Sequence, residues 1–193
     1  MTILNLRFTE LANLIPIFEV ESGSKIEEAA SLIIEAFRNN NKILICGNGG
    51  SAADSQHFAA EFVNTFSKDL QRKSLSAIAL TTDTSVLTAI SNDFDYSNIF
   101  ARQIEAHARS GDILVVLTTS GSSKNCIKAV EQASKVGIKS IAFTRTGAEI
   151  TKSSSVSIQV PSKNTQHIQE CHMLAYHVIT EIVEEKLFRG ATK

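Results

Sequence analysis

The chain has 193 residues, of which 43% are hydrophobic and 20% charged, and its formal net charge is −1. This composition is typical of one globular domain, and the lack of a basic run argues against nucleic acid as the main partner. No apolar run reaches the roughly 18 residues of a membrane span, segment 1–23 does not resemble a signal peptide, and the three cysteines indicate a reduced, cytoplasmic protein.

The hydrophobic pattern predicts helices that alternate with short apolar strands. Helices are expected over 5–21 and 24–39, the first interrupted by Pro16 and the second capped by Ser24. Strands are predicted at 42–46, 75–80, 112–117, 138–143 and 155–160. Later helices are predicted at 52–66, 83–91, 98–109, 123–136 and 165–188, with a turn at Asn92 and Asp93.

Apolar strands alternating with helices form a parallel sheet that is covered on both faces. We therefore predict a single α/β domain over residues 1–193, with N-terminal helices in 1–40 and the α/β core with the last helix in 41–193. Ligand sites in such folds lie beyond the carboxyl ends of the strands. This rule directs attention to 47–54, 92–93 and 118–123.

The segment 47–52, Gly-Asn-Gly-Gly-Ser-Ala, follows a predicted strand and opens a helix. Glycine lets backbone N–H groups approach an anionic or polyhydroxyl ligand at the helix N-terminus. The segment fits a loose dinucleotide fingerprint, but the acidic residue expected after the second strand is missing. A tight turn without any ligand is the alternative interpretation.

The segment 117–123, Leu-Thr-Thr-Ser-Gly-Ser-Ser, also follows a strand and opens a helix. Hydroxyl and backbone N–H donors at a helix N-terminus favour a bound phosphate. Plain capping by Ser122 or Ser123 is the alternative, but one serine would suffice for it. We interpret the segment as a phosphate loop.

Four spaced motifs resemble those of the phosphoheptose isomerase family, within the sugar-isomerase (SIS) domain superfamily. They are CGNGGSAAD (46–54), HFAAE (57–61), LTTSGSS (117–123) and HIQECHMLAYH (167–177). The resemblance, which runs from about 26 to 185, implies a flavodoxin-like five-stranded parallel sheet and a homotetramer whose active sites lie between subunits. It also implies isomerisation of sedoheptulose 7-phosphate to D-glycero-D-manno-heptose 7-phosphate, the first step toward the heptose of lipopolysaccharide.

The same resemblance implies roles for individual residues. Glu61 corresponds to the catalytic carboxylate, and His177 is the candidate acid or base for the substrate oxygens. A zinc ion is expected on His57, Glu61, Gln169 and His177. Substrate contacts are expected from Asn48, Gly49, Gly50, Ser51, Glu61, Asn92, Asp93, Thr118, Thr119, Ser120, Ser123 and Gln169. His177 cannot serve at once as a tight zinc ligand and as a free acid, so both roles stay open.

The spacing of these residues agrees with a shared site. His57 and Glu61 are four residues apart, so they share one face of their helix. Gln169 and His177 are eight apart, about two turns, and lie broadly on one side of theirs. His107 and His172 have no such partners, and we expect surface or packing roles for them.

Two positions depart from the family pattern. Thr65 and His167 stand where the family has arginine, whose bidentate contacts threonine cannot replace. Two other functions stay open. One is a non-enzymatic SIS-domain protein that binds the replication initiator, and the other is a sugar-phosphate sensor that uses the serine loop without Glu61.

Overall fold

The computed structural model describes residues 2–190, so residues 1 and 191–193 of the predicted domain lie outside the described residues. Five strands form one parallel sheet: β1 (Ile43–Gly47), β2 (Ala77–Ala79), β3 (Ile113–Leu117), β4 (Lys139–Arg145) and β5 (Val156–Val160). Their order, β2-β1-β3-β4-β5, is that of flavodoxin-like sheets. The predicted fold class is therefore confirmed.

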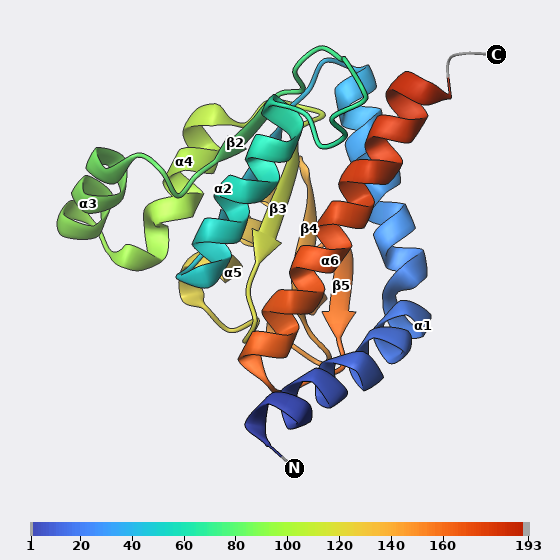
Figure 1. Cartoon of the computed structure of the whole chain (residues 1–193). Helices are drawn as coiled ribbons and strands as arrows, with labels where there is room; N and C mark the ends of the chain where they lie inside the picture. The colour runs from blue at the N-terminus through green and yellow to red at the C-terminus, as the bar shows by residue number, and fades with distance from the viewer. Residues whose placement is uncertain (1, 191–193) are drawn as a thin grey trace.

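Within residues 2–190, six α-helices connect or flank the strands, as Figure 1 illustrates. They are α1 (Ile3–Arg38), α2 (Gly50–Val63), α3 (Thr84–Asp93), α4 (Ile99–His107), α5 (Lys124–Lys135) and α6 (Thr165–Glu184). Short 3-10 helices span Tyr96–Asn98 and Glu149–Lys152, and a π-helix, Glu185–Arg189, extends α6. Among the described residues no helix is both long and apolar enough to cross a membrane.

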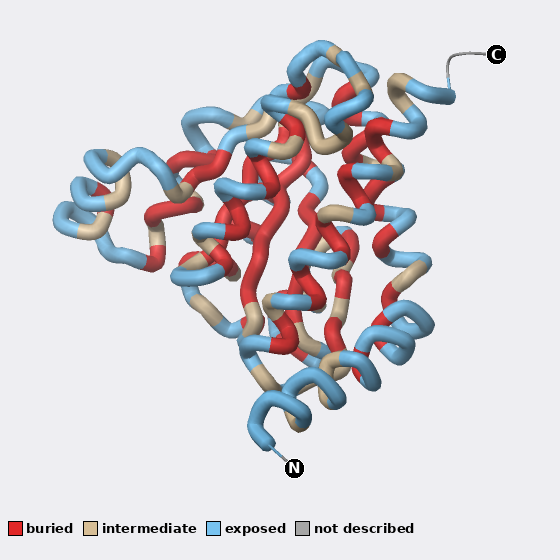
Figure 2. The backbone as a smooth tube through the Cα atoms, in the orientation of Figure 1, coloured by how far each residue is buried: buried red, intermediate tan, exposed pale blue. Residues whose placement is uncertain are grey.

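The two faces of the sheet carry separate apolar clusters, because side chains alternate along each strand. Ile43 and Ile45 of β1 pack on the face covered by α1, α2 and α6. Leu44 and Cys46 pack on the other face, against α4 and α5. Figure 2 shows the buried backbone running along the central strands. All five residues of β1 and of β3 are buried, which explains their unbroken apolar sequence.

The prediction of two N-terminal helices was wrong, since α1 is one helix of 36 residues with Pro16 inside it. Its buried positions Leu14, Phe18, Ser22 and Ile26 recur every four residues and form one continuous stripe across the expected break. Ser22 anchors the helix to the edge strand, since its hydroxyl donates to Gln159 O (2.8 Å) and accepts from Gln159 N (3.1 Å). Ser24 is therefore mid-helix, and α1 changes direction instead of ending (Figure 1).

Two further boundaries differ from the predictions. Asn92 and Asp93 form the last turn of α3 rather than a connecting turn, because the chain leaves the helix only at Phe94, whose N–H still bonds Ile90. The α-helical part of the last helix ends at Glu184, and the π-helix covers the rest of the predicted length.

Candidate active site

The glycine loop joins β1 to α2 at the carboxyl edge of the sheet. Gly49 is the N-cap residue of α2 and has φ of +58°, a conformation that glycine adopts without strain. A side chain at Gly50 would collide with the amide nitrogen of Gln169. The side chain of Gln169 on α6 therefore packs directly on the backbone of the loop at Gly50. This contact brings together two segments that the sequence motifs had singled out.

Asn48 lies in this loop, and its side-chain amide is already bonded. It exchanges two hydrogen bonds with the amide of Asn125, with N···O distances of 2.9 and 2.8 Å. Its Oδ1 also accepts from the Tyr96 hydroxyl at 2.9 Å. The predicted substrate contact through this side chain would have to displace these partners, and the backbone carbonyl of Asn48 already accepts from Ser51 N at 3.0 Å.

The hydroxyl loop follows β3 and opens α5. Ser123 is the N-cap residue of α5, yet its side chain makes no capping hydrogen bond. The hydroxyl of Thr118 accepts from Gly121 N at 3.2 Å, and that of Ser120 accepts from Ser122 N at 3.3 Å. Capping by Ser123 therefore does not account for this cluster of hydroxyl groups.

Arg145 lies beside the hydroxyl loop and was not singled out from the sequence. Its Nε donates to Ser120 O at 3.2 Å. It is the last residue of β4, and β4 is the neighbour of β3 in the sheet. Because parallel strands end at the same edge, this position brings a guanidinium group to the loop, and strand order was the signal that could have found it.

His57 and Glu61 meet on α2, and His177 of α6 joins them. His57 Nε2 lies 2.8 Å from Glu61 Oε1, and the two side chains are 42% and 18% exposed. The ring centroids of His57 and His177 are 5.2 Å apart. One ligand atom from each of the three residues lies within 4.8 Å of the others. The structure therefore groups three of the four predicted metal ligands, while the amide of Gln169 contacts Gly50.

The environment of His177 favours its neutral form. Burial lowers the pKa of His177, the neighbouring His57 lowers it further, and Glu61 acts in the opposite direction. A neutral imidazole can accept a proton or bind a metal ion. The ring also packs against Phe66, with centroids 5.5 Å apart.

Two residues beside His57 were missed by the sequence analysis. The hydroxyl of Tyr176 lies 3.0 Å from His57 Nδ1, and the Tyr176 side chain is fully buried. Asp54 is buried one helical turn before His57. Burial raises the pKa of Asp54, while the nearby His57 and a hydrogen bond with Tyr176 act to lower it.

Three further predicted substrate contacts are Asn92 and Asp93 at the end of α3 and Ser51 at the start of α2. Asn92 Nδ2 donates to Asp93 Oδ1 at 2.9 Å at the exposed end of α3, and Figure 1 shows α3 on the side of the molecule away from α6. Ser51 is buried in the first turn of α2. Their contacts with a substrate stay predictions.

The two positions that depart from the family pattern have structural contacts. The Thr65 hydroxyl donates to Ser67 O at 3.1 Å and lies 3.3 Å from Glu184 Oε1. His167 is buried, with Nε2 3.8 Å from Glu10 Oε2. His172 is fully buried and packs edge-on against Phe143, in agreement with the expected packing role.

Comparisons with known proteins agree in one family. The SIS domain family model matches residues 8–145. The phosphoheptose isomerase of Thermodesulfovibrio yellowstonii is 51% identical over 169 residues, covering 87% of this chain and 83% of that protein.

Two solved structures extend the likeness to three dimensions. The phosphoheptose isomerase of Neisseria gonorrhoeae is 39% identical with a TM-score of 0.88, covering 94% of this chain and 97% of its own. That of Francisella tularensis is 35% identical with a TM-score of 0.86, covering 96% and 100%. The chain therefore belongs to the phosphoheptose isomerase family of SIS-domain proteins.

Proposed function

We propose that this chain is an aldose–ketose isomerase that interconverts sedoheptulose 7-phosphate and D-glycero-D-manno-heptose 7-phosphate. The observation that carries the proposal is the grouping of Glu61 with His57 and His177 on two neighbouring helices. The 51% identity to a phosphoheptose isomerase supports this substrate over other sugar phosphates. In this role the product supplies heptose for lipopolysaccharide.

The reaction moves one proton between adjacent carbons of the open-chain sugar through an enediol. Glu61 is suited to take the proton from one carbon and return it to the next, because one carboxylate can accept and then donate the same proton. Proton transfer on the oxygens and opening of the sugar ring need a second group. His177 fits this task because the lowered pKa keeps its imidazole neutral near pH 7.

The same three side chains fit a zinc ion. Two imidazoles and one carboxylate are a donor set of catalytic zinc sites, and their ligand atoms lie within 4.8 Å of one another. When bound, zinc would polarise the substrate carbonyl. We keep Gln169 as the proposed fourth ligand. If His177 holds the metal, the proton transfers on oxygen fall to another group.

The loop after β3 is the proposed phosphate site. Its donors are the helix N-terminus and the hydroxyls of Thr118, Thr119, Ser120 and Ser123. Arg145, bonded to Ser120 O, adds positive charge beside them. This cation offsets in part the arginines that are absent at Thr65 and His167.

The direct test is a turnover assay with sedoheptulose 7-phosphate, before and after treatment with a zinc chelator. We expect the untreated protein to form the heptose 7-phosphate, and we expect chelation to abolish turnover until Zn²⁺ is restored. Binding of the sugar phosphate without turnover would favour the sensor alternative. The absence of both binding and turnover would favour the non-enzymatic SIS-domain protein. Turnover that survives chelation would remove zinc from the proposal and leave the Glu61 chemistry standing.

We also propose that the chain is a homotetramer, formed through α1 and α6. Large apolar side chains are exposed on both helices, namely Ile3, Leu4, Phe8, Ile15, Ile17, Val20, Met173, Leu174 and Val178. A groove of about 300 Å³ lies between the helices and is lined by side chains that include Phe18, Leu174 and Val178. Exposed apolar surface of this extent is typical of protein–protein contacts.

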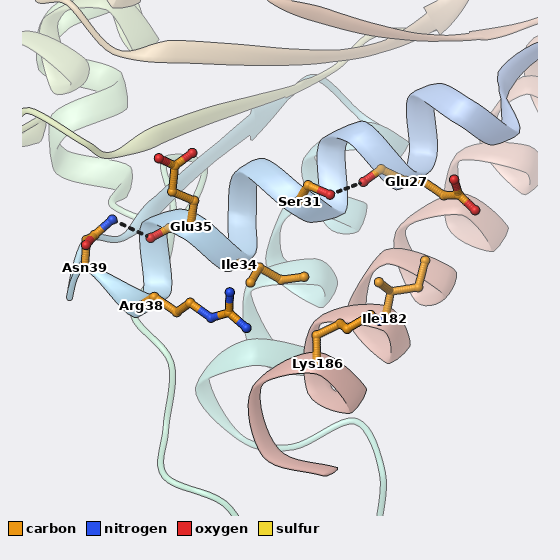
Figure 3. Close-up of a pocket in the computed structure, with 8 residues that line it drawn as sticks. All are labelled: Glu27, Ser31, Ile34, Glu35, Arg38, Asn39, Ile182 and Lys186. Carbon is orange, nitrogen blue, oxygen red and sulfur yellow. Dashed lines mark hydrogen bonds between the residues drawn. The ribbon is translucent and has the colours of Figure 1, made fainter. Parts of the chain in front are cut away.

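A second recess lies between the later part of α1 and the end of α6. Its volume is about 710 Å³, and Figure 3 shows Ile34 and Ile182 facing one another across it, with Arg38 and Lys186 near its end. The mixture of apolar and charged lining suits a second copy of the chain.

Light scattering at micromolar chain concentration is therefore expected to give the mass of four chains. Leu174→Glu should dissociate the assembly, because it places a charge in the apolar contact, whereas Glu131→Gln at an exposed position of α5 should not. A monomeric unmodified protein would contradict the proposal and any active site shared between subunits. The free, buried cysteines among the described residues support a cytoplasmic location for this assembly.

A further inference from the structure

The glycine loop and the hydroxyl loop start side by side at the carboxyl edge of the sheet. Gly47 and Leu117, the last residues of β1 and β3, are partners in the parallel register, and a side chain at Gly47 would come within 2.8 Å of Leu117 O. The loops then lead to helices on opposite faces of the sheet, since Phe58 of α2 and Ala129 of α5 belong to different apolar clusters. The apolar core therefore does not join the start of α2 to the start of α5.

Two asparagine side chains above this edge make the connection instead. Asn48 lies just before α2, and Asn125 lies in the first turn of α5, where it is only 3% exposed. Their carboxamides exchange two hydrogen bonds, at 2.9 and 2.8 Å. Asn125 Oδ1 also accepts from Cys126 N at 3.0 Å. Because a backbone N–H can only donate, this contact fixes the orientation of both amides.

Tyr96 adds a third segment to this connection, the 3-10 helix 96–98. Its hydroxyl donates to Asn48 Oδ1 at 2.9 Å, the same oxygen that accepts from the opposite amide. Lys128 of α5 holds the 3-10 helix in place, since its Nζ donates to Ser97 Oγ at 2.7 Å. Both acceptor positions of the Asn48 carbonyl oxygen are thereby occupied, so this side chain ties three segments of the edge together.

The proposed substrate needs both loops at once. Its phosphate binds at the hydroxyl loop before α5, whereas the carbons that exchange a proton must reach Glu61 of α2. We propose that Tyr96 and Asn125 are positioning residues that, through the Asn48 amide, brace the start of α2 against the start of α5 and so fix the distance between the phosphate site and Glu61. The inference rests on the proposed function. A shift of about 1 Å in such a distance is enough to reduce turnover strongly.

Isothermal titration with two probes tests the brace. Sedoheptulose 7-phosphate spans both loops, whereas inorganic phosphate needs the hydroxyl loop alone. Tyr96→Phe removes one hydroxyl from a side chain that is 56% exposed, so the fold should persist. We expect it to weaken binding of the sugar phosphate about 3- to 10-fold, the effect of one hydrogen bond, and to leave the affinity for inorganic phosphate within twofold.

Thr88→Ala is the matched control. It also removes a hydroxyl from the segment that follows β2, but that hydroxyl donates only within α3, to Thr84 O at 2.7 Å and Ser85 O at 3.2 Å. Both probes should bind this variant like the unmodified protein. A Tyr96→Phe variant that binds the sugar phosphate within twofold of the unmodified protein would overturn the brace. Equal losses for both probes would also overturn it, because they would show a general disturbance of the edge.

A second variant tests whether the two positioning residues act through the same amide. Asn125→Ala removes both hydrogen bonds to the Asn48 amide and should weaken binding of the sugar phosphate about 10- to 100-fold. Combined with Tyr96→Phe it should lose no more than it does alone, because the amide is already released. Losses that multiply would overturn a shared brace. Should Asn125→Ala fail to fold by circular dichroism, Tyr96→Phe alone decides.

The same titrations separate the brace from the proposed function. An unmodified protein that binds the sugar phosphate without turnover would refute the isomerase, while the loss in Tyr96→Phe would still support the brace. An unmodified protein that turns over the sugar phosphate and is unaffected by Tyr96→Phe would refute the brace alone. Binding of neither probe would overturn both.

Discussion

Glu61→Gln is expected to reduce isomerase turnover at least ~10²-fold, the low end for loss of a general base. A glutamine amide keeps the size of the side chain but cannot accept the carbon-bound proton. The fold should persist, because the carboxylate of Glu61 belongs to a half-buried polar cluster between α2 and α6 rather than to the apolar core. The variant should therefore still bind the sugar phosphate at the loop after β3.

The measurement is exchange of the C1 and C2 protons of the substrate in deuterated buffer, which reports the proposed step directly. Glu131→Gln is the matched control and should exchange at the unmodified rate. An unmodified protein without exchange would refute the isomerase proposal. A Glu61→Gln variant that exchanges normally would keep the reaction but transfer the role of base to another residue, with His177 the next to test.

Arg72→Met is expected to lower the free energy of unfolding by about 3–5 kcal/mol, the cost of breaking a buried ion pair. Arg72 Nε lies 2.6 Å from Glu184 Oε1, and the two side chains are 0% and 2% exposed. The guanidinium also donates to Glu61 O at 2.7 Å and to Phe62 O at 2.9 Å. Removing it leaves a buried carboxylate unneutralised and takes one donor from Glu61 O, while Phe62 O keeps its hydrogen bond from Leu75 N at 3.0 Å.

Urea unfolding at equal chain concentrations measures this loss, since assembly makes stability concentration-dependent. Arg7→Met is the control, because the Arg7–Glu10 pair is 54% and 40% exposed and should contribute less than about 1 kcal/mol. The double change Arg72→Met with Glu184→Leu should recover much of the stability, because no unpaired charge stays buried. A loss of under about 1 kcal/mol for Arg72→Met would show that the pair is not a stabilising element.

The same pair has a defined effect at low pH. Burial raises the pKa of Glu184, but hydrogen bonds from Phe66 N, Arg72 and Ser67 outweigh it, so the pKa is below its ordinary 4.5. A carboxyl group with a lowered pKa contributes its full stability above the unfolded value and loses it as pH falls through the folded value. The stability difference between the unmodified protein and Glu184→Gln should therefore shrink below about pH 4.5.

Local sequence patterns predicted the features that depend on residues close together in the sequence. The strands were found because each is a short apolar run, and the His57–Glu61 pair because four residues complete about one helical turn. The contacts of Tyr176 with His57 and of Arg72 with Glu184 span 119 and 112 residues, and no spacing rule connects such positions. The break expected near Ser24 was wrong because packing of the apolar stripe against the sheet outweighed a local capping signal.

The ion pair between Arg72 and Glu184 also has a consequence for folding during synthesis at the ribosome. Arg72 is synthesised early, whereas its partner Glu184 and the ring of His177 belong to α6, the last α-helix among the described residues. Until α6 has emerged from the ribosome, the Arg72 guanidinium near the end of α2 lacks its carboxylate partner, and Glu61 lacks the neighbouring imidazole of His177. Polypeptides cut short before this helix should therefore be both unstable and inactive.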